Sequence, residues 1–127
     1  MNREVNPESI AAPAANYAHA VLTESPSRWL HTSGVVPIAP DGTVAASIAD
    51  QARQVWANIG AMLAEAAMSA DDIVSVTTYA VVDQSLSGVM AARDEFMAGH
   101  RAASTLITVP ALVRPEWKLE IAIIAAT

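Results

Sequence analysis

Histidine is the side chain best suited to move a proton near neutral pH, and this chain has three histidines. His19 lies two residues after Tyr17, so in an extended strand the two side chains point to the same face, where His19 can serve as a general acid or base. A hydrogen bond from His19 to the backbone is the alternative, and the sequence leaves both open. His31 and Ser33 also share a face, but no aspartate lies at a spacing that completes a catalytic triad.

The residue types argue against metal and thiol chemistry. The histidines lie far apart, without the HxH or HExxH spacing of zinc ligands. His100 is expected at the end of a helix, where a cation suits the helix dipole. Cysteine is absent, which excludes disulfides, thiol nucleophiles and thiolate ligands. We therefore expect no metal site.

Length and composition indicate one domain, residues 1–127, with more apolar surface than a small monomer hides easily. Apolar residues make up 53% of the chain and charged residues 16%, which favours a subunit interface. The net charge is −6, and seven basic residues are spread singly among thirteen acidic ones, so we expect no nucleic-acid partner. No signal peptide and no membrane-spanning run is present, which favours a cytoplasmic protein without a membrane partner.

Hydrophobic periodicity predicts strands interrupted by two helices. Residues 1–12 are polar and contain proline, which predicts an extended lead-in. The predicted elements are strands at 17–23 and 29–37, a turn at 40–42, a short return strand at 43–46, a helix at 47–68 capped by Ser47, a strand at 73–82, a helix at 86–98, and strands at 104–109 and 118–126. This order predicts an α+β fold with both helices on one face of a mixed sheet. The other face is expected to pack on neighbouring subunits.

Four stretches in the right order resemble the RidA (YjgF) family of enamine/imine deaminases and their relatives. They are Pro13 with Tyr17–Val21, Trp29 with Ser33–Gly34 and Asp41–Gly42, Gln51 through Asn58 and Leu63 to Asp72–Val74, and Lys118–Ile121 with Ile124–Ala125. The resemblance implies a chorismate-mutase-like fold, a homotrimer with a central barrel, and ligand clefts at the subunit interfaces. It also implies hydrolysis of reactive 2-imino or 2-enamino acids without a cofactor, because the C=N carbon of the substrate is itself electrophilic.

The sequence departs from the family pattern at the residues that carry this chemistry. Ser104 stands where the deaminases have an arginine that grips the substrate carboxylate with a two-pronged hydrogen-bonded pair. The closing strand reads Glu120-Ile121-Ala122 in place of E-I-E, so the second carboxylate is missing, and Met90 replaces a frequent asparagine. Of the polar cleft residues that the resemblance implies, Tyr17, Ser33 and the Gly34 backbone remain.

Other side chains can replace the missing arginine and the missing carboxylate. Arg101, Arg114 and Arg28 are candidate substitutes for the missing arginine, with Arg114 the best placed because its loop borders the expected cleft; the alternative for each is a solvated loop arginine. Glu120 can position a water molecule or pair with Lys118 or Arg114, and Trp117 can wall a ligand or serve packing. We expect a trimer with an altered cleft that binds a small metabolite and hydrolyses an imine, enamine or related C–N substrate. The alternative is a non-catalytic metabolite-binding or protein-stabilising trimer; an RNA-cleaving activity is disfavoured by the acidic charge.

Overall fold

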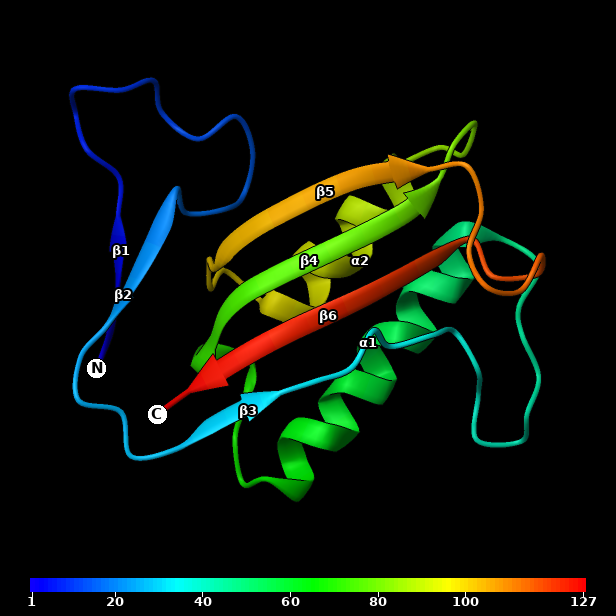
Figure 1. The fold of residues 1–127 in the computed structure, drawn as a ribbon, viewed down its shortest axis with the longest axis horizontal. Coiled ribbons are helices and arrows are strands. Elements are labelled where there is room, and N and C mark those ends of the chain that lie inside the picture. Colours follow the sequence, from blue (N-terminus) through cyan, green and yellow to red (C-terminus); the bar gives the residue numbers. More distant parts are fainter.

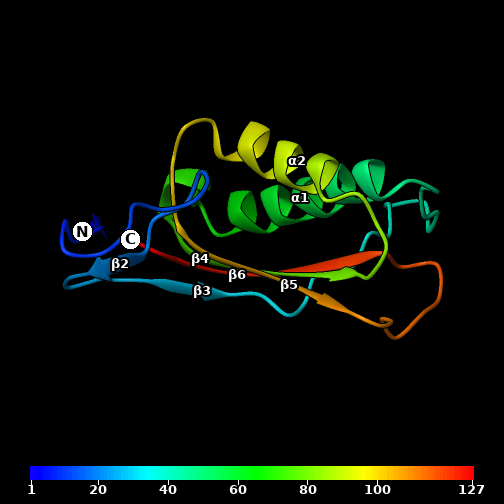
Figure 2. The ribbon, with the colours of Figure 1, turned by 90° about the horizontal axis from the view of Figure 1, so that it is seen from above.

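The computed structural model describes residues 1–127 as a two-layer α+β domain. A four-stranded sheet forms one layer, and both helices lie on the same side of it (Figures 1 and 2). The elements are β1 (Asn2–Val5), β2 (Ala20–Thr23), β3 (Trp29–His31), α1 (Ile48–Glu65), a short 3₁₀ helix (Ala70–Asp72), β4 (Ile73–Val81), α2 (Ser87–Met97), β5 (Ala103–Val109) and β6 (Leu119–Ala126). The predicted fold class is therefore confirmed.

The main sheet has the strand order β3-β6-β4-β5. β6 runs antiparallel to both β3 and β4, whereas β4 and β5 are parallel. A parallel pair needs a crossover between its strands, and α2 supplies it. The register places Glu120 of β6 opposite Tyr79 of β4, and Ser104 of β5 beside Val76 of β4.

The helix α1 begins as its sequence predicts. The Ser47 hydroxyl accepts a hydrogen bond of 3.1 Å from the Asp50 N–H, and Asp50 adds a negative charge in the first turn. The apolar stripe of α1 is buried against the sheet and α2. At the other end, the Arg28 guanidinium donates hydrogen bonds of 2.6 and 3.3 Å to the carbonyl oxygens of Ala66 and Ala67, which satisfies groups that a helix end leaves without partners.

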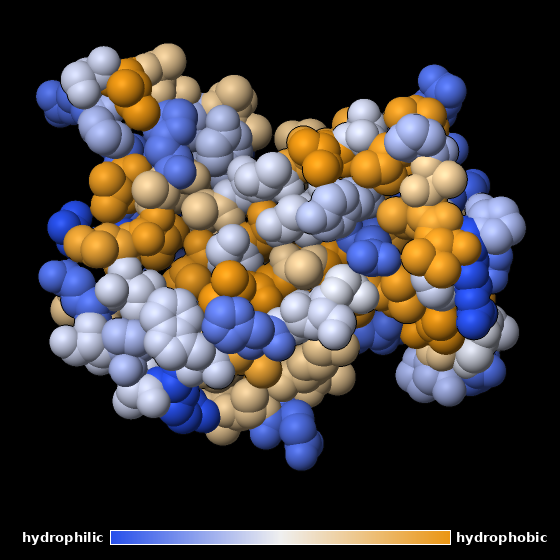
Figure 3. Space-filling view, viewed as in Figure 1, coloured by the Kyte–Doolittle hydropathy of each residue, from blue (hydrophilic) through white to orange (hydrophobic).

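The hydrophobic core fills the space between the helices and one face of the sheet. In β6, Leu119, Ile121 and Ile123 are buried, whereas Glu120, Ala122 and Ile124 alternate with them on the opposite face. No element of the chain covers that opposite face (Figure 2). Figure 3 shows apolar surface spread across it among polar side chains. We call this surface the open face.

Sequence-based expectations differ from the structure at three main points. The strand predicted at 29–37 is regular only over β3, with an isolated bridge from Val35 to Ile121, because the Thr32 hydroxyl accepts the Ile123 N–H and interrupts the ladder. Residues 2–5, expected as an unpaired part of the lead-in, form β1 and pair with β2 in a small second sheet, because the polar β1 residues find hydrogen-bond partners in residues 20–23. The short return strand at 43–46 does not form. Thr43 closes the turn locally through a backbone bond to Ala39, and the chain then enters α1 without reaching another strand. No helix is both long and apolar enough to span a membrane.

Candidate functional site

Glu120 lies on the open face, near the end of the sheet where the loop 110–118 returns to β6. Its side chain is folded over Gly34: a Cβ atom at position 34 would lie 2.6 Å from Cδ and 2.9 Å from Cγ of Glu120. Glycine at this position therefore leaves room for the Glu120 side chain, and no unusual backbone conformation calls for it. Tyr79 lies directly across from Glu120 on the neighbouring strand and faces the same side.

The Glu120 carboxylate has no partner within the chain. Lys118, one of the two cations considered for it, donates from Nζ to the Ala46 carbonyl oxygen at 2.7 Å. Arg114, the other, lies with its guanidinium carbon 5.2 Å from the centre of the Trp117 ring in a cation–π contact. Neither forms an ion pair with Glu120. A half-buried, unpaired carboxylate is a suitable group to hold a water molecule or take a proton.

A Gly34→Ala substitution should separate the placement of Glu120 from the stability of the fold. The added methyl group would displace the flexible carboxylate end of Glu120 and leave the backbone in place, so the free energy of unfolding should change by less than about 1 kcal/mol. Turnover, or ligand affinity if no turnover is found, should fall at least about tenfold. The matched control is Gly60→Ala in α1, which should leave function unchanged. Equal activity of Gly34→Ala and the parent protein would show that the position of this carboxylate is unimportant.

Tyr17 and His19 lie at the β5 edge of the sheet, beside the start of β5. Between them, Ala18 donates from its backbone N–H to the Ala102 carbonyl oxygen at 3.0 Å and forms a bridge with Ala103. The two rings meet edge to face with their centroids 6.1 Å apart. The His19 Nε2 atom donates to the Ala11 carbonyl oxygen at 2.6 Å, which is the backbone-bonded alternative considered for this residue.

Ser104 and Glu120 lie in two separate parts of the chain, which we call half-sites: one with Tyr17 and Ser104, the other with Glu120 and Gly34. The register of β5 with β4 places Ser104 on the helix side of the sheet, whereas Glu120 lies on the open face. Their strands, β5 and β6, lie on either side of β4, so the two residues are about 10 Å apart across the sheet. Their partners on β4 are three residues apart, which adds about 10 Å along the strands. One chain alone therefore does not bring the predicted site residues together.

The three arginines considered as substitutes for the missing one are engaged elsewhere. Arg28 caps α1, as described above. Arg101 forms an ion pair with Glu4 of β1, with Nε 2.9 Å from Oε1. Arg114 is exposed and packs over Trp117, at the Glu120 end of the sheet and away from Ser104. None of them occupies the space beside Ser104 within its own chain.

The loop 110–118 is held by Gln51, a residue to which the sequence analysis assigned no role. Gln51 is 1% exposed; its Nε2 donates to the carbonyl oxygens of Ala45 and Glu116 at 2.8 Å each, and its Oε1 accepts from the Lys118 N–H at 2.8 Å. Trp117, within this loop, is buried, and its Nε1 makes no hydrogen bond. Its burial supports a packing role. The sequence does indicate that Gln51 is unusual, because it places an amide within the apolar stripe of α1.

Asn58 of α1 positions the segment after β3 that contains Ser33 and Gly34. Its Nδ2 donates to the carbonyl oxygens of Val36 and Ile38 at 3.3 and 3.0 Å, and its Oδ1 accepts from Gln54 at 2.9 Å. Ser33 and Gly34 form one wall of a groove of about 300 Å³ between this segment and α1. The groove places two of the predicted binding residues at the surface, on the edge of the sheet.

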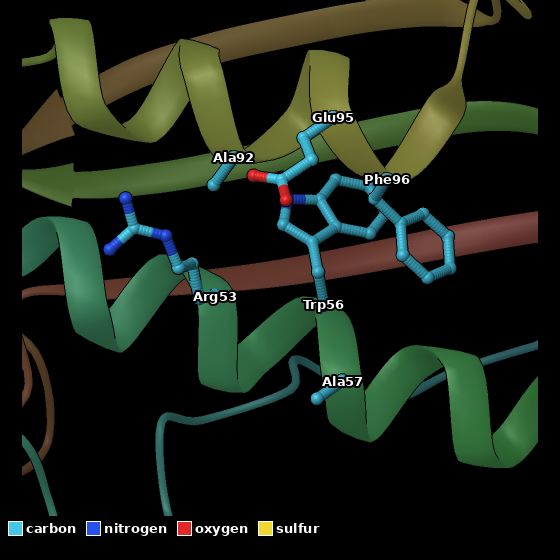
Figure 4. A pocket seen from close by; sticks show the side chains of 6 residues that line it. All are labelled: Arg53, Trp56, Ala57, Ala92, Glu95 and Phe96. Carbon is cyan, nitrogen blue, oxygen red and sulfur yellow. The ribbon is translucent and has the colours of Figure 1, made fainter.

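A larger hollow of about 460 Å³ lies between the two helices, far from the predicted residues. Figure 4 shows Arg53, Trp56 and Ala57 of α1 facing Ala92, Glu95 and Phe96 of α2. The Trp56 and Phe96 rings stack with centroids 4.9 Å apart, so the floor of the hollow is occupied by the contact that joins the helices. No three histidine, aspartate or glutamate side chains lie close enough together to hold a metal ion.

Known proteins share this fold. The model of the family described as Endoribonuclease L-PSP matches residues 8–127. Protein HMF1 of Saccharomyces cerevisiae is 31% identical over 106 residues, which cover 83% of this chain and 80% of that protein. YyfB of Yersinia pestis, a solved member of the conserved Rid protein family whose function is unknown, superposes with a TM-score of 0.89 at 31% identity over 99% of this chain and 98% of that one.

The solved structure of the Escherichia coli YjgF gene product is also similar, with a TM-score of 0.72 at 27% identity and 98% coverage of both chains. The chain therefore belongs to the Endoribonuclease L-PSP family, that of the Rid (YjgF) proteins. The resemblance that the sequence motifs indicated is confirmed. Membership supports, in general terms, a small-metabolite-binding or deaminase-like role.

Proposed function

We propose that the protein is a homotrimer whose intersubunit clefts bind a small metabolite and hydrolyse an imine, enamine or related C–N substrate. Membership in the Rid family and the uncovered apolar open face support the assembly. The separation of the half-sites supports a cleft that two copies share, with Glu120 from one copy facing Tyr17 and Ser104 of the next. A cytoplasmic location also stays a prediction.

The observation that carries the catalytic proposal is the unpaired Glu120 carboxylate held against Gly34. In the proposed reaction, Glu120 takes a proton from water as the water oxygen bonds to the C=N carbon. The same carboxyl group then returns a proton to the nitrogen. This gives a carbinolamine. The carboxylate then passes the hydroxyl proton to the nitrogen as the C=O bond forms and the C–N bond breaks, and the products are a carbonyl compound and ammonia. The substrate supplies the electrophile, so the proposal requires no cofactor.

The rival proposal is a trimer that binds a metabolite without turning it over, or that stabilises other proteins. Ser104 and Ala122 favour this rival, because they lack the guanidinium and the second carboxylate that the resemblance implies for the deaminases. The family is named for an endoribonuclease. The net charge of −6, without a basic stripe, disfavours RNA as a substrate of this chain.

Ammonia release from 2-aminoacrylate generated in situ distinguishes these proposals. The parent protein should be slow, because a Ser104 hydroxyl replaces only about 1 kcal/mol of the several that a buried guanidinium–carboxylate pair contributes. Ser104→Arg should raise the rate at least about tenfold, and Glu120→Gln in the same background should abolish the gain. Thr108→Arg, farther along the same side of β5, is the matched control and should give no gain.

A parent protein as fast as deaminases that carry the arginine would refute our interpretation of Ser104. Full activity of the Glu120→Gln variant would refute the assigned proton transfer. A search of small metabolites by thermal shift then tests the rival, since a ligand that binds the folded protein raises its apparent stability whether or not it reacts.

A further inference from the structure

Arg93 is a buried cation to which neither the fold nor the proposed reaction assigns a task. Its side chain is 11% exposed, and it lies on α2 at the same face as Val89 and Met97, one turn from each. Both of these residues belong to the core cluster against which Leu106 of β5 packs. A core position next to a strand is normally apolar, because burying a charge costs free energy unless the charge is well paired.

The pairing of Arg93 is incomplete. Its Nε and Nη2 atoms both donate to a single oxygen, Oδ1 of Asp94, at 3.1 Å each. A two-pronged arginine–carboxylate pair uses both oxygens at shorter distances. Nη1 of Arg93 makes no hydrogen bond, and Asp94 is 39% exposed. The guanidinium therefore keeps donors that a further carboxylate can use.

Arg93 lies on the sheet-facing side of α2, with its guanidinium beside Asp94, and Ser104 lies on the same helix side of the sheet. A neighbouring flank of α2, with Ala92, Glu95 and Phe96, faces α1 (Figure 4). Asp94 borders a small cavity together with Asn16. Asn16 leads directly into the segment whose Ala18 pairs with Ala102 and Ala103 at the start of β5.

We propose that Arg93 is the carboxylate-binding residue of the cleft, in place of the missing strand arginine. Within the proposed function, this defines the substrate as an acid. In this proposal the carboxylate binds beside Asp94, at the outer end of the Arg93 side chain, and therefore farther from the reacting carbon than a guanidinium at position 104 would hold it. The substrate class is therefore imines or enamines of oxo acids in which additional carbons separate the carboxylate from the C=N carbon.

The test measures binding of product analogues to the intact protein by calorimetry. The probes are 4-oxopentanoate, whose carboxylate is remote from the carbonyl, pyruvate, whose carboxylate is adjacent, and 4-oxopentanamide, which is uncharged. The parent protein should bind 4-oxopentanoate at least about tenfold more tightly than either other probe. Arg93→Gln should lose that preference, and Arg93→Lys should recover only part of it, since lysine lacks the fork. Arg53→Gln, an exposed arginine of α1, is the matched control.

Two further variants separate ligand binding from a structural role. Asp94→Asn removes the competing carboxylate and should tighten 4-oxopentanoate binding, which loss of a purely structural pair would not do. Arg93→Gln combined with Ser104→Arg returns a guanidinium to the strand and should shift the preference to pyruvate. Circular dichroism and light scattering check that each variant folds and assembles as the parent protein does.

The outcomes are distinct from those of the proposed function. Unchanged 4-oxopentanoate binding in Arg93→Gln overturns the inference, as does a parent protein that binds neither acid. If the parent protein prefers pyruvate and Arg93→Gln removes that preference, Arg93 still binds the carboxylate, but the inference of a longer substrate is overturned. The ammonia assay with Glu120→Gln tests the hydrolytic proposal independently of these binding results.

Discussion

Gln51→Leu should lower the free energy of unfolding by about 3 kcal/mol. The substitution removes three hydrogen bonds at once and leaves the Lys118 N–H and the carbonyl oxygens of Ala45 and Glu116 without partners in a buried region. Each buried group left without a partner costs about 1–3 kcal/mol, and the added apolar contacts of leucine offset part of the total. Because Gln51 joins α1 to the loop before β6, Glu120 should also lose its fixed position, and turnover or ligand affinity should fall with stability.

Urea unfolding followed by circular dichroism measures this effect, at one fixed protein concentration because assembly contributes to apparent stability. The matched control is Gln54→Leu, one turn along α1, where a single side-chain bond to Asn58 is removed at a half-buried position. That change should cost about 1 kcal/mol. If Gln51→Leu costs no more than Gln54→Leu, the loop is held by other contacts and the role assigned to Gln51 is wrong.

Ala122→Arg should convert the assembled protein into a folded monomer. Ala122 lies in the middle of the open face, between Glu120 and Ile124 on β6. A guanidinium buried there at a subunit contact would cost several kcal/mol without a partner, whereas in a monomer it would remain in water. Light scattering should give a mass near 13.3 kDa for the variant, against about 40 kDa for a trimer of the parent chain.

Ala64→Arg on the exposed side of α1 is the control for added charge, and it should remain assembled. Far-ultraviolet circular dichroism should show the same secondary structure in both variants, because the core lies on the other face of the sheet. Ligand binding should be lost only in Ala122→Arg. An Ala122→Arg protein with unchanged mass would mean that the open face is not the subunit contact.

The sequence predicts the main sheet and both helices because their patterns are strong. The apolar stripe of α1, with its Ser47 cap, fits only the helical period. The β-branched run of β4 fits only a strand. The second sheet was not predicted, because β1 is polar and short and owes its strand state to pairing with β2. The return strand at 43–46 has strand-like residues but no available partner.

The candidate site was only partly accessible from the sequence. Strand alternation correctly places Glu120 and Ala122 on one face. The position of Ser104 on the other side depends on the register of a parallel pair, which the sequence does not specify. Arg93 gives no distinct signal, because charged residues are frequent on helices and its burial arises only when α2 packs against the sheet. His19, Ser104 and Glu120 remain predicted site residues, and the experiments above test them.

Cross-linking between copies tests most directly the claim that two subunits share each cleft. The chain contains no cysteine, so Ser104→Cys and Glu120→Cys introduced together provide the only thiols. The two positions lie on opposite sides of the sheet within one chain, and a short bis-maleimide should join them only between neighbouring copies. We predict covalent dimers and trimers on a denaturing gel for the double variant and uncross-linked chains for each single variant. A double variant that remains monomeric at protein concentrations where the parent chain assembles would contradict the shared cleft.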